Sequence, residues 1–180
     1  EPGDKVLIQP PVYYPFNLAI ENNGREIVTN PLIYGDGNYR MDYEDLEKKV
    51  SDPKVTMTIL CSPHNPVGRV WTRDELKRFA EICIAHDVTI ISDEIHGDLT
   101  YPGVHFTPLA TVSDEIAENT VVIHAPSKTF NLAGMHTSNL IIPGEALREK
   151  YDATLTIDGL FGLNPLSAVA LETAYTECDE

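Results

Sequence analysis

Basic residues are scarce in this chain of 180 residues. Lysine and arginine together number 13, against 28 aspartates and glutamates, so the formal net charge is −15 at pH 7. Because nucleic acids and anionic membranes are bound by clustered Lys and Arg side chains, this shortage argues against both as partners. Apolar runs are also short. None approaches the roughly 20 residues that a membrane-spanning helix needs, and no charged-then-apolar leader opens the chain.

Cysteine is scarce too, at three residues, and no two of them form a C-x-x-C pair. Cys61 and Cys83 lie in strongly apolar stretches, which favours buried thiols in a reducing compartment, so we expect a cytoplasmic protein. The histidines lack the spacing of a metal site, and the chain has no H-E-x-x-H pair, P-loop or G-x-S-x-G elbow. The sequence therefore predicts no metal centre.

The chain does contain short β-branched apolar runs that alternate with helical patterns. We expect strands at residues 5–9, 26–29, 56–61, 89–92, 120–124 and 139–142, and helices at residues 13–22, 42–50, 72–86 and 165–176. Thr72 and Glu75 form a capping-box pattern at the start of the third helix. This order predicts a single α/β domain over residues 1–180, with a mostly parallel sheet covered by helices. The stretch between the last two strands has no helical pattern, so the sixth strand should run antiparallel.

Ligands of an open α/β sheet bind beyond the carboxyl ends of its strands. Tyr13 follows the first expected strand, Asn65 the third, Asp93 the fourth and Lys128 the fifth. A lysine near apolar walls can form an imine, and a carboxylate that ends a buried strand needs a cationic partner. An aromatic ring can cover a flat heterocycle, while an amide can donate a hydrogen bond to a ring oxygen. Together these groups meet the needs of pyridoxal 5′-phosphate.

Each of these residues also has an ordinary structural interpretation. Lys128 alone would be a solvated loop lysine, and Asp93 alone would cap a turn. Asn65-Pro66 is a common turn dipeptide, and Tyr13 could be a rim aromatic. The functional interpretation depends on the four occurring together and in this order.

Three motifs make the chain similar to a known family. Residues 62–68 (SPHNPVG), 92–96 (SDEIH) and 127–134 (SKTFNLAG) resemble the class I/II aminotransferases of pyridoxal-phosphate fold type I. The resemblance is greatest to the cystathionine β-lyase branch, the MalY/PatB-type carbon–sulfur lyases, and it covers essentially the whole chain.

The resemblance implies a role for each residue at the strand ends. Lys128 would bond covalently to the cofactor and then move the α-proton of the substrate. Asp93 would pair with the pyridinium nitrogen, and Asn65 would donate a hydrogen bond to the ring hydroxyl oxygen. Tyr13 would stack on the cofactor ring, and the hydroxyl of Ser127 would approach the phosphate.

Two histidines depart from the pattern of the aminotransferases. Many of those enzymes have Tyr three residues after the aspartate, where this chain has His96, and Arg eight residues after the lysine, where it has His136. Both departures are compatible with the lyase branch. His96 would belong to the cofactor site, and His136 would either assist phosphate binding or fill space.

The implied activity is β-elimination from cystathionine or related cysteine S-conjugates, which yields pyruvate, ammonia and a thiol. An aminotransferase is the first alternative, and a non-catalytic binding or regulatory module is the second. Enzymes of the family are about twice this length, so we expect a large domain truncated at both ends, without a phosphate-binding helix and the arginine for the substrate carboxylate. The full-length parent should act on a small amino acid as a homodimer, and the isolated chain should turn over little.

Overall fold

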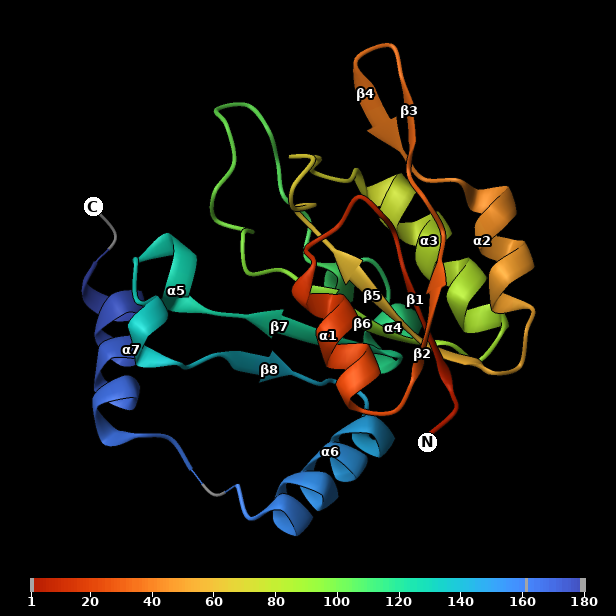
Figure 1. The fold of residues 1–180 in the computed structure, drawn as a ribbon. Helices are drawn as coiled ribbons and strands as arrows, with labels where there is room; N and C mark the ends of the chain where they lie inside the picture. Colours follow the sequence, from red (N-terminus) through yellow and green to blue (C-terminus); the bar gives the residue numbers. More distant parts are fainter. Residues whose placement is uncertain (1, 161, 179–180) are drawn as a thin grey trace.

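A six-stranded sheet forms the centre of the computed structural model (Figure 1), which describes residues 2–160 and 162–178. Glu1, Phe161, Asp179 and Glu180 lie outside the described residues. The strand order is β2-β1-β5-β6-β7-β8, and all neighbouring strands are parallel except β7 and β8. The strands are β1 (Lys5–Ile8), β2 (Glu26–Thr29), β5 (Val55–Cys61), β6 (Thr89–Asp93), β7 (Thr120–His124) and β8 (Asn139–Ile141).

The mostly parallel α/β architecture and the antiparallel sixth strand are therefore confirmed. Each expected strand is present, with ends that differ by no more than one residue from the sequence-based prediction. The reason is that strands of a parallel sheet are covered on both faces, so they read as short continuous apolar runs. Leu7, Leu60 and Ile90 in the middle of β1, β5 and β6 are fully buried.

The helices are α1 (Pro15–Asn22), α2 (Tyr43–Val50), α3 (Arg73–Ala85), α4 (Asp114–Glu118), α5 (Pro126–Thr129), α6 (Glu145–Asp158) and α7 (Pro165–Glu177). The four predicted helices are α1, α2, α3 and α7. The capping box of α3 is present, with the Thr72 hydroxyl accepting from the Glu75 N–H and the Glu75 carboxylate accepting from the Thr72 N–H.

Some elements were not predicted. The expectation that residues 125–138 hold no helix was wrong, because α5 forms there; its four residues are too few to display a helical period. Helix α6 was missed although it carries a signal: Leu147, Tyr151 and Leu155 recur every four residues and are its half-buried side chains, while none of its side chains is fully buried. A separate hairpin of β3 (Ile33–Gly35) and β4 (Asn38–Arg40) was also missed.

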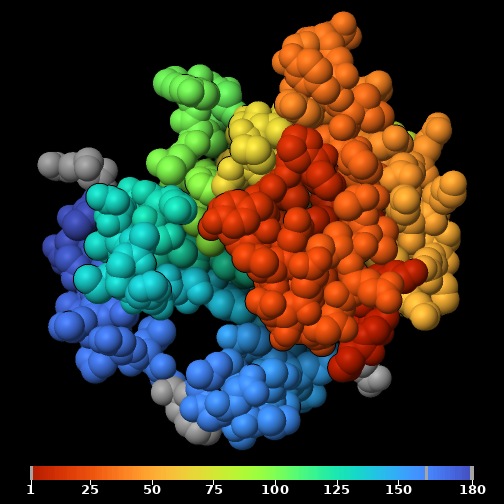
Figure 2. Space-filling model, viewed as in Figure 1, coloured from red at the N-terminus to blue at the C-terminus, as the bar shows by residue number. Residues whose placement is uncertain are grey.

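The two faces of the sheet are covered unequally. Helices α2 and α3 bury one face, where Trp71, Leu76 and Phe79 are fully buried. On the other face α1 contributes Ile20, which packs over Val6 of β1. Figure 2 shows the N-terminal part of the chain as a continuous mass, whereas α6 lies apart from α5 across an opening. Within residues 2–160 and 162–178, no helix combines the length and apolar character needed to cross a membrane.

Candidate active site

The loop after β5 carries Asn65 in a closed turn. The backbone N–H of Asn65 donates to Cys61 Sγ over 3.3 Å. His64 N donates to the Arg69 carbonyl at 2.7 Å, and Gly68 N donates to the His64 carbonyl at 2.8 Å. The turn needs glycine at position 68, where φ is +74°. These bonds fix the backbone that presents the Asn65 amide.

Asp93 ends β6 beside this loop, and its register pairs it with Cys61 of β5 and Ile123 of β7. Its Oδ1 accepts a hydrogen bond from the Ile95 N–H at 3.2 Å. Burial raises the pKa of the Asp93 carboxyl, while the Ile95 N–H and the charges of His96 and Lys128 lower it. Lys128 follows β7, which runs parallel to β6, so Asp93 and Lys128 both stand at the carboxyl edge of the sheet.

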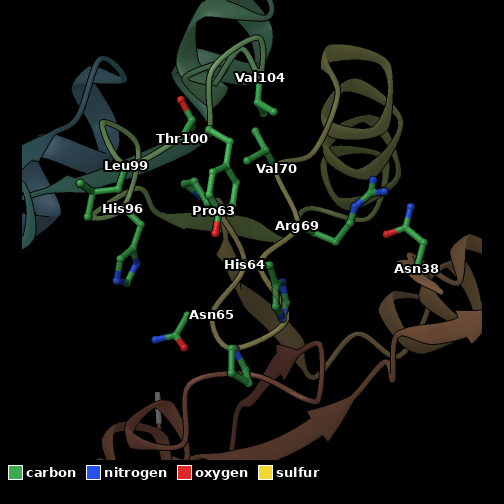
Figure 3. Close-up of a pocket in the computed structure, with 13 residues that line it drawn as sticks. Asn38, Pro63, His64, Asn65, Arg69, Val70, His96, Leu99, Thr100 and Val104 are labelled. Atoms are coloured by element: carbon green, nitrogen blue, oxygen red, sulfur yellow. The ribbon is translucent and has the colours of Figure 1, made fainter.

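A cavity of about 480 Å³ opens between these loops (Figure 3). Asn65 and His96, from the loops after β5 and β6, both line it, and Figure 3 shows their side chains extending into a shared space. Tyr101 and Val104 of the long loop after β6 line it as well. Nothing in the sequence marked that loop as part of the site, because it carries no periodic pattern. The structure thus brings together two of the polar side chains that the sequence analysis selected.

Lys128 lies on α5, which begins two residues after β7 ends. Ser127 is half-buried, whereas Lys128 is exposed, so the apolar walls that the sequence analysis expected around it are not found among the described residues. The turn is held by Thr129, whose Oγ1 donates to Asp98 Oδ2 at 2.8 Å. Phe130 packs its ring edge-on against Tyr175 of α7, with 5.4 Å between ring centroids. Packing of α5 therefore comes from α7 rather than from the sheet alone.

Tyr13 and His136 lie outside the cavity that Asn65 and His96 line. Tyr13 is 42% exposed, and its ring contacts Tyr14 and Phe16 of its own segment. His136 is exposed, has a left-handed φ of 49°, and lines a second cavity with Ser167 near the start of α7. Within the part of the chain that the structure describes, His136 and Asn65 therefore line different cavities.

Two buried groups near the site were not singled out from the sequence. Glu94 is 1% exposed, and its Oε1 accepts from the Ser92 hydroxyl and the Leu109 N–H, each at 2.8 Å. Burial raises the pKa of the Glu94 carboxyl. His64 is also 1% exposed, and its Nε2 lies 3.1 Å from the Pro11 carbonyl oxygen. The period-2 alternation of side chains along β6 was the available signal for Glu94, because it places Glu94, one residue past the strand, on the same face as the buried Ser92.

Burial raises the pKa of the Cys61 thiol to about 12. A thiol with so high a pKa holds little thiolate at neutral pH, so Cys61 is a structural group rather than a nucleophile.

An α/β fold with a lysine, a carboxylate and an amide at the carboxyl edge of its sheet defines the class of protein, and sequence comparison identifies the family. The model of the family described as aminotransferase class I and II matches residues 1–150, and the chain belongs to this family. It is 52% identical over 177 residues to cystathionine beta-lyase PatB of Bacillus subtilis, an alignment that covers 98% of this chain and 46% of that protein. It is 33% identical over 178 residues to protein MalY of Escherichia coli, covering 98% and 45%.

Solved structures agree with this assignment. A PLP-bound putative aminotransferase from Clostridium difficile 630 superposes with a TM-score of 0.95 at 46% identity, covering 99% of this chain and 46% of that one. Cystalysin from Treponema denticola, which contains a pyridoxal 5′-phosphate cofactor, superposes with a TM-score of 0.93 at 43% identity, covering 99% and 45%. The chain spans about half the length of the curated relatives it matches.

Proposed function

We propose that this chain is the cofactor-binding large domain of a pyridoxal-phosphate-dependent carbon–sulfur β-lyase. Its substrate would be cystathionine or a related cysteine S-conjugate. The observation that carries the proposal is the cavity that Asn65 and His96 line together at the carboxyl edge of the sheet, where Asp93 ends the neighbouring strand β6. The similarity to a cystathionine beta-lyase at 52% identity supports it.

The residues at the site fit the chemistry of pyridoxal phosphate. The partly buried Asp93 carboxyl has a raised pKa, so a cationic pyridinium nitrogen would relieve the cost of ionising it. Asn65 and His96, in one cavity, provide hydrogen-bonding groups for the ring hydroxyl oxygen. We assign Tyr13 to the face of the ring.

Two further residues are proposed as contacts of the phosphate. Ser127 directly precedes Lys128, and its hydroxyl is the first of them. His136 is the second, and it would reach the phosphate only if the segment between α5 and β8 turned towards the cavity, because His136 now lines a different one.

The roles of the chain's own groups follow from this arrangement. The bound cofactor supplies an electron-withdrawing ring next to the α-carbon of the substrate. Lys128 Nζ takes the α-proton and holds it during the departure of the β-thiolate. Asp93, as the carboxylate, keeps the ring nitrogen charged. Asn65 orients the ring, and Tyr13 excludes water from its face.

The test of this proposal is the product formed by the full-length protein. Incubation with cystathionine should release pyruvate, measured through a coupled lactate dehydrogenase assay, and Lys128→Ala should slow the release by about 10²–10⁴-fold. Absence of pyruvate from the loaded enzyme would remove the lyase assignment.

The second candidate function is amino transfer on the same scaffold. Relatives with that activity in their names also match, among them the asparagine--oxo-acid transaminase of Streptococcus mutans, at 33% identity over 134 residues. Amino transfer to an added keto acid that far outpaces pyruvate formation would reverse the order of the two candidates. A third candidate is a non-catalytic module, and a yellow chromophore that borohydride fixes onto Lys128 would favour the two enzyme functions over it.

We further propose that the full-length protein is a cytoplasmic homodimer without nucleic-acid or membrane partners, and that this chain alone retains the cofactor weakly. The net charge of −15 and the buried free thiols of Cys61 and Cys83 support the compartment and the absence of such partners. Light scattering on the full-length protein tests the dimer, and a visible spectrum of the isolated chain tests cofactor retention.

A further inference from the structure

His64 lies between the two loops that carry Asn65 and Tyr13. Its side chain is 1% exposed, although it belongs to neither a helix nor a strand. Its Nε2 is 3.1 Å from the carbonyl oxygen of Pro11, which is 53 residues away in the sequence and two residues before Tyr13. A single buried ring thus bridges the loop after β1 and the loop after β5.

The direction of this hydrogen bond fixes the state of the ring. A carbonyl oxygen only accepts, so Nε2 carries the hydrogen and donates it to Pro11. Burial lowers the pKa of His64, an effect that hydrogen bonding to backbone groups of Pro11, Gln9 and Cys61 partly offsets. The ring is therefore neutral at pH 7, with its proton on Nε2.

The ring itself is held in place by its neighbours. It meets the fully buried Trp71 edge-on, with 5.5 Å between centroids and an interplanar angle of 86°. Trp71 Nε1 donates to the Cys61 carbonyl at 3.0 Å, and the Cys61 thiol in turn accepts from the Asn65 N–H. His64 is therefore part of the same rigid unit as the backbone of Asn65.

The segment of Tyr13 is held more lightly. The Pro10 carbonyl accepts from the Leu32 N–H at 2.7 Å on one side, and the Pro11 carbonyl accepts from His64 on the other. Beyond Pro11, Val12 and Phe16 are partly buried against the small core under α1. The Tyr13 ring itself meets the rings of Tyr14 and Phe16 of its own segment. The hydrogen bond from His64 to the Pro11 carbonyl thus joins the segment of Tyr13 to the loop of Asn65.

We propose that His64 is a positioning residue, whose Nε2–H holds the Pro11 carbonyl and so sets the Tyr13 loop relative to the Asn65 loop. His64 is among the residues that line the cavity of Asn65 and His96, and its role there is to hold Pro11, next to which its Nε2 lies at 3.1 Å. The proposal rests on the proposed function only where it invokes the cofactor. The loop geometry it describes exists without one.

The test uses three variants of the full-length protein. His64→Gln places an amide donor near the position of Nε2, His64→Asn is too short to reach Pro11, and His64→Phe fills the space without a donor. His86→Asn is the control, because His86 makes a comparable contact of 2.8 Å with Glu47, at the far end of α3.

Two measurements are made on each protein. The first is the dissociation constant of pyridoxal phosphate, read from the visible circular dichroism of the bound cofactor. We expect it to rise roughly five- to tenfold in His64→Asn and His64→Phe, the size of one lost hydrogen bond, and to change less than about threefold in His64→Gln. The second is hydrogen exchange at the amides of residues 12–14 without cofactor, which should accelerate in the same two variants only.

Each outcome decides the question. Unchanged exchange in His64→Asn, or equal acceleration in His64→Gln and His64→Phe, would overturn the positioning role. If the wild-type protein binds no pyridoxal phosphate, the proposed function fails, and the exchange measurement still decides the role of His64. Should His64→Phe not fold, by far-ultraviolet circular dichroism, the pair of Gln and Asn variants decides it.

Discussion

The loop after β5 and the segment after β7 both lie at the carboxyl edge of the sheet, but they are held in different ways. In the loop, residues 62–68, His64 is 1% exposed, and Trp71 just beyond it is fully buried. In the segment, residues 125–138, Lys128 is exposed, and Asn131 and His136 adopt left-handed φ values of 54° and 49°. The Asn65 loop, the packed side of the candidate site, is therefore held by buried side chains. The Lys128 segment, the open side, carries its key residues exposed to solvent.

The difference follows from which parts of the chain supply the contacts. Partners of the loop come from the segment after β1, from the ends of β5 and β6, and from residues 69–71. The segment bonds to Asp98 through Thr129, but its other partners come from later in the chain: the Ser167 hydroxyl of α7 donates to the Met135 carbonyl at 2.6 Å, and Tyr175 packs on Phe130. A fixed amide and a freer lysine suit their proposed roles, since the amide orients a ring while the lysine moves a proton.

The largest expected difference between the two regions comes from removing the reactive amine of the Lys128 segment. Lys128→Ala should lower pyruvate formation by the full-length protein by about 10²–10⁴-fold, because the group that moves the α-proton is gone. The thermal midpoint should stay unchanged, since the Lys128 side chain is exposed. Lys77→Ala on α3, another exposed lysine, is the control and should leave the rate intact. A rate in Lys128→Ala close to that of the wild type would show that Lys128 is not the proton carrier.

On the packed side, we expect a substitution in the core next to the Asn65 loop to lower the stability of the fold. Trp71→Ala should lower the free energy of unfolding by about 3–5 kcal/mol, because a fully buried indole leaves a cavity and the Cys61 carbonyl loses its donor. Urea unfolding of the full-length protein measures this. Tyr34→Ala, in the hairpin and 64% exposed, should cost much less. Equal losses in the two variants would contradict the packed-unit description.

A smaller effect is expected from removing one hydrogen bond that holds the Lys128 segment. Thr129→Val removes the hydroxyl that donates to Asp98 while keeping the side-chain shape. Since one net hydrogen bond is worth about 0.5–1.5 kcal/mol, we expect hydrogen exchange at residues 129–131 to accelerate by roughly two- to tenfold. The same substitution at Thr154 of α6, which donates to the Lys150 carbonyl, should leave those amides unaffected. No acceleration in Thr129→Val would mean that α7 alone holds the segment.

The smallest effect concerns pH. Because the pKa of folded His64 lies below its ordinary 6.5, the unfolded chain binds more protons than the folded one between those two values. The free energy of unfolding should therefore fall as pH drops below 6.5. His64→Gln, which has no titrating ring, should lose less stability than the wild type between pH 7 and pH 5.5. Urea titrations at both pH values measure the difference. Identical losses in both proteins would contradict the lowered pKa.

Short-range sequence patterns predicted the six strands of the sheet and four of the helices. The capping box at Thr72 and the apolar runs of the parallel strands are short-range features, and both were found as expected. The β3–β4 hairpin also had a local signal that went unused. Asp36 and Gly37 adopt left-handed φ values of 52° and 76°, the pattern of an Asp-Gly hairpin turn.

The candidate site was less accessible to prediction, because it depends on contacts between distant residues. Strand-end placement brought Asn65, Asp93 and Lys128 to one edge of the sheet. It could not reveal that Lys128 is exposed, since its surroundings are set by α7. Nor could it show that His136 lines a different cavity from Asn65, because the left-handed turn at His136 depends on the packing of the segment around it.

The position of α7 late in the chain affects the order in which the two sides of the site can fold during synthesis. The hydrogen bonds that the structure describes for residues 62–68 are complete once Asp93 has been added, whereas the Lys128 segment also needs Ser167 and Tyr175. Since a chain leaves the ribosome from its N-terminus, the ring-orienting half can fold well before the lysine-bearing half. A nascent chain would thus hold an ordered amide loop while its lysine turn still lacks the helix that supports it.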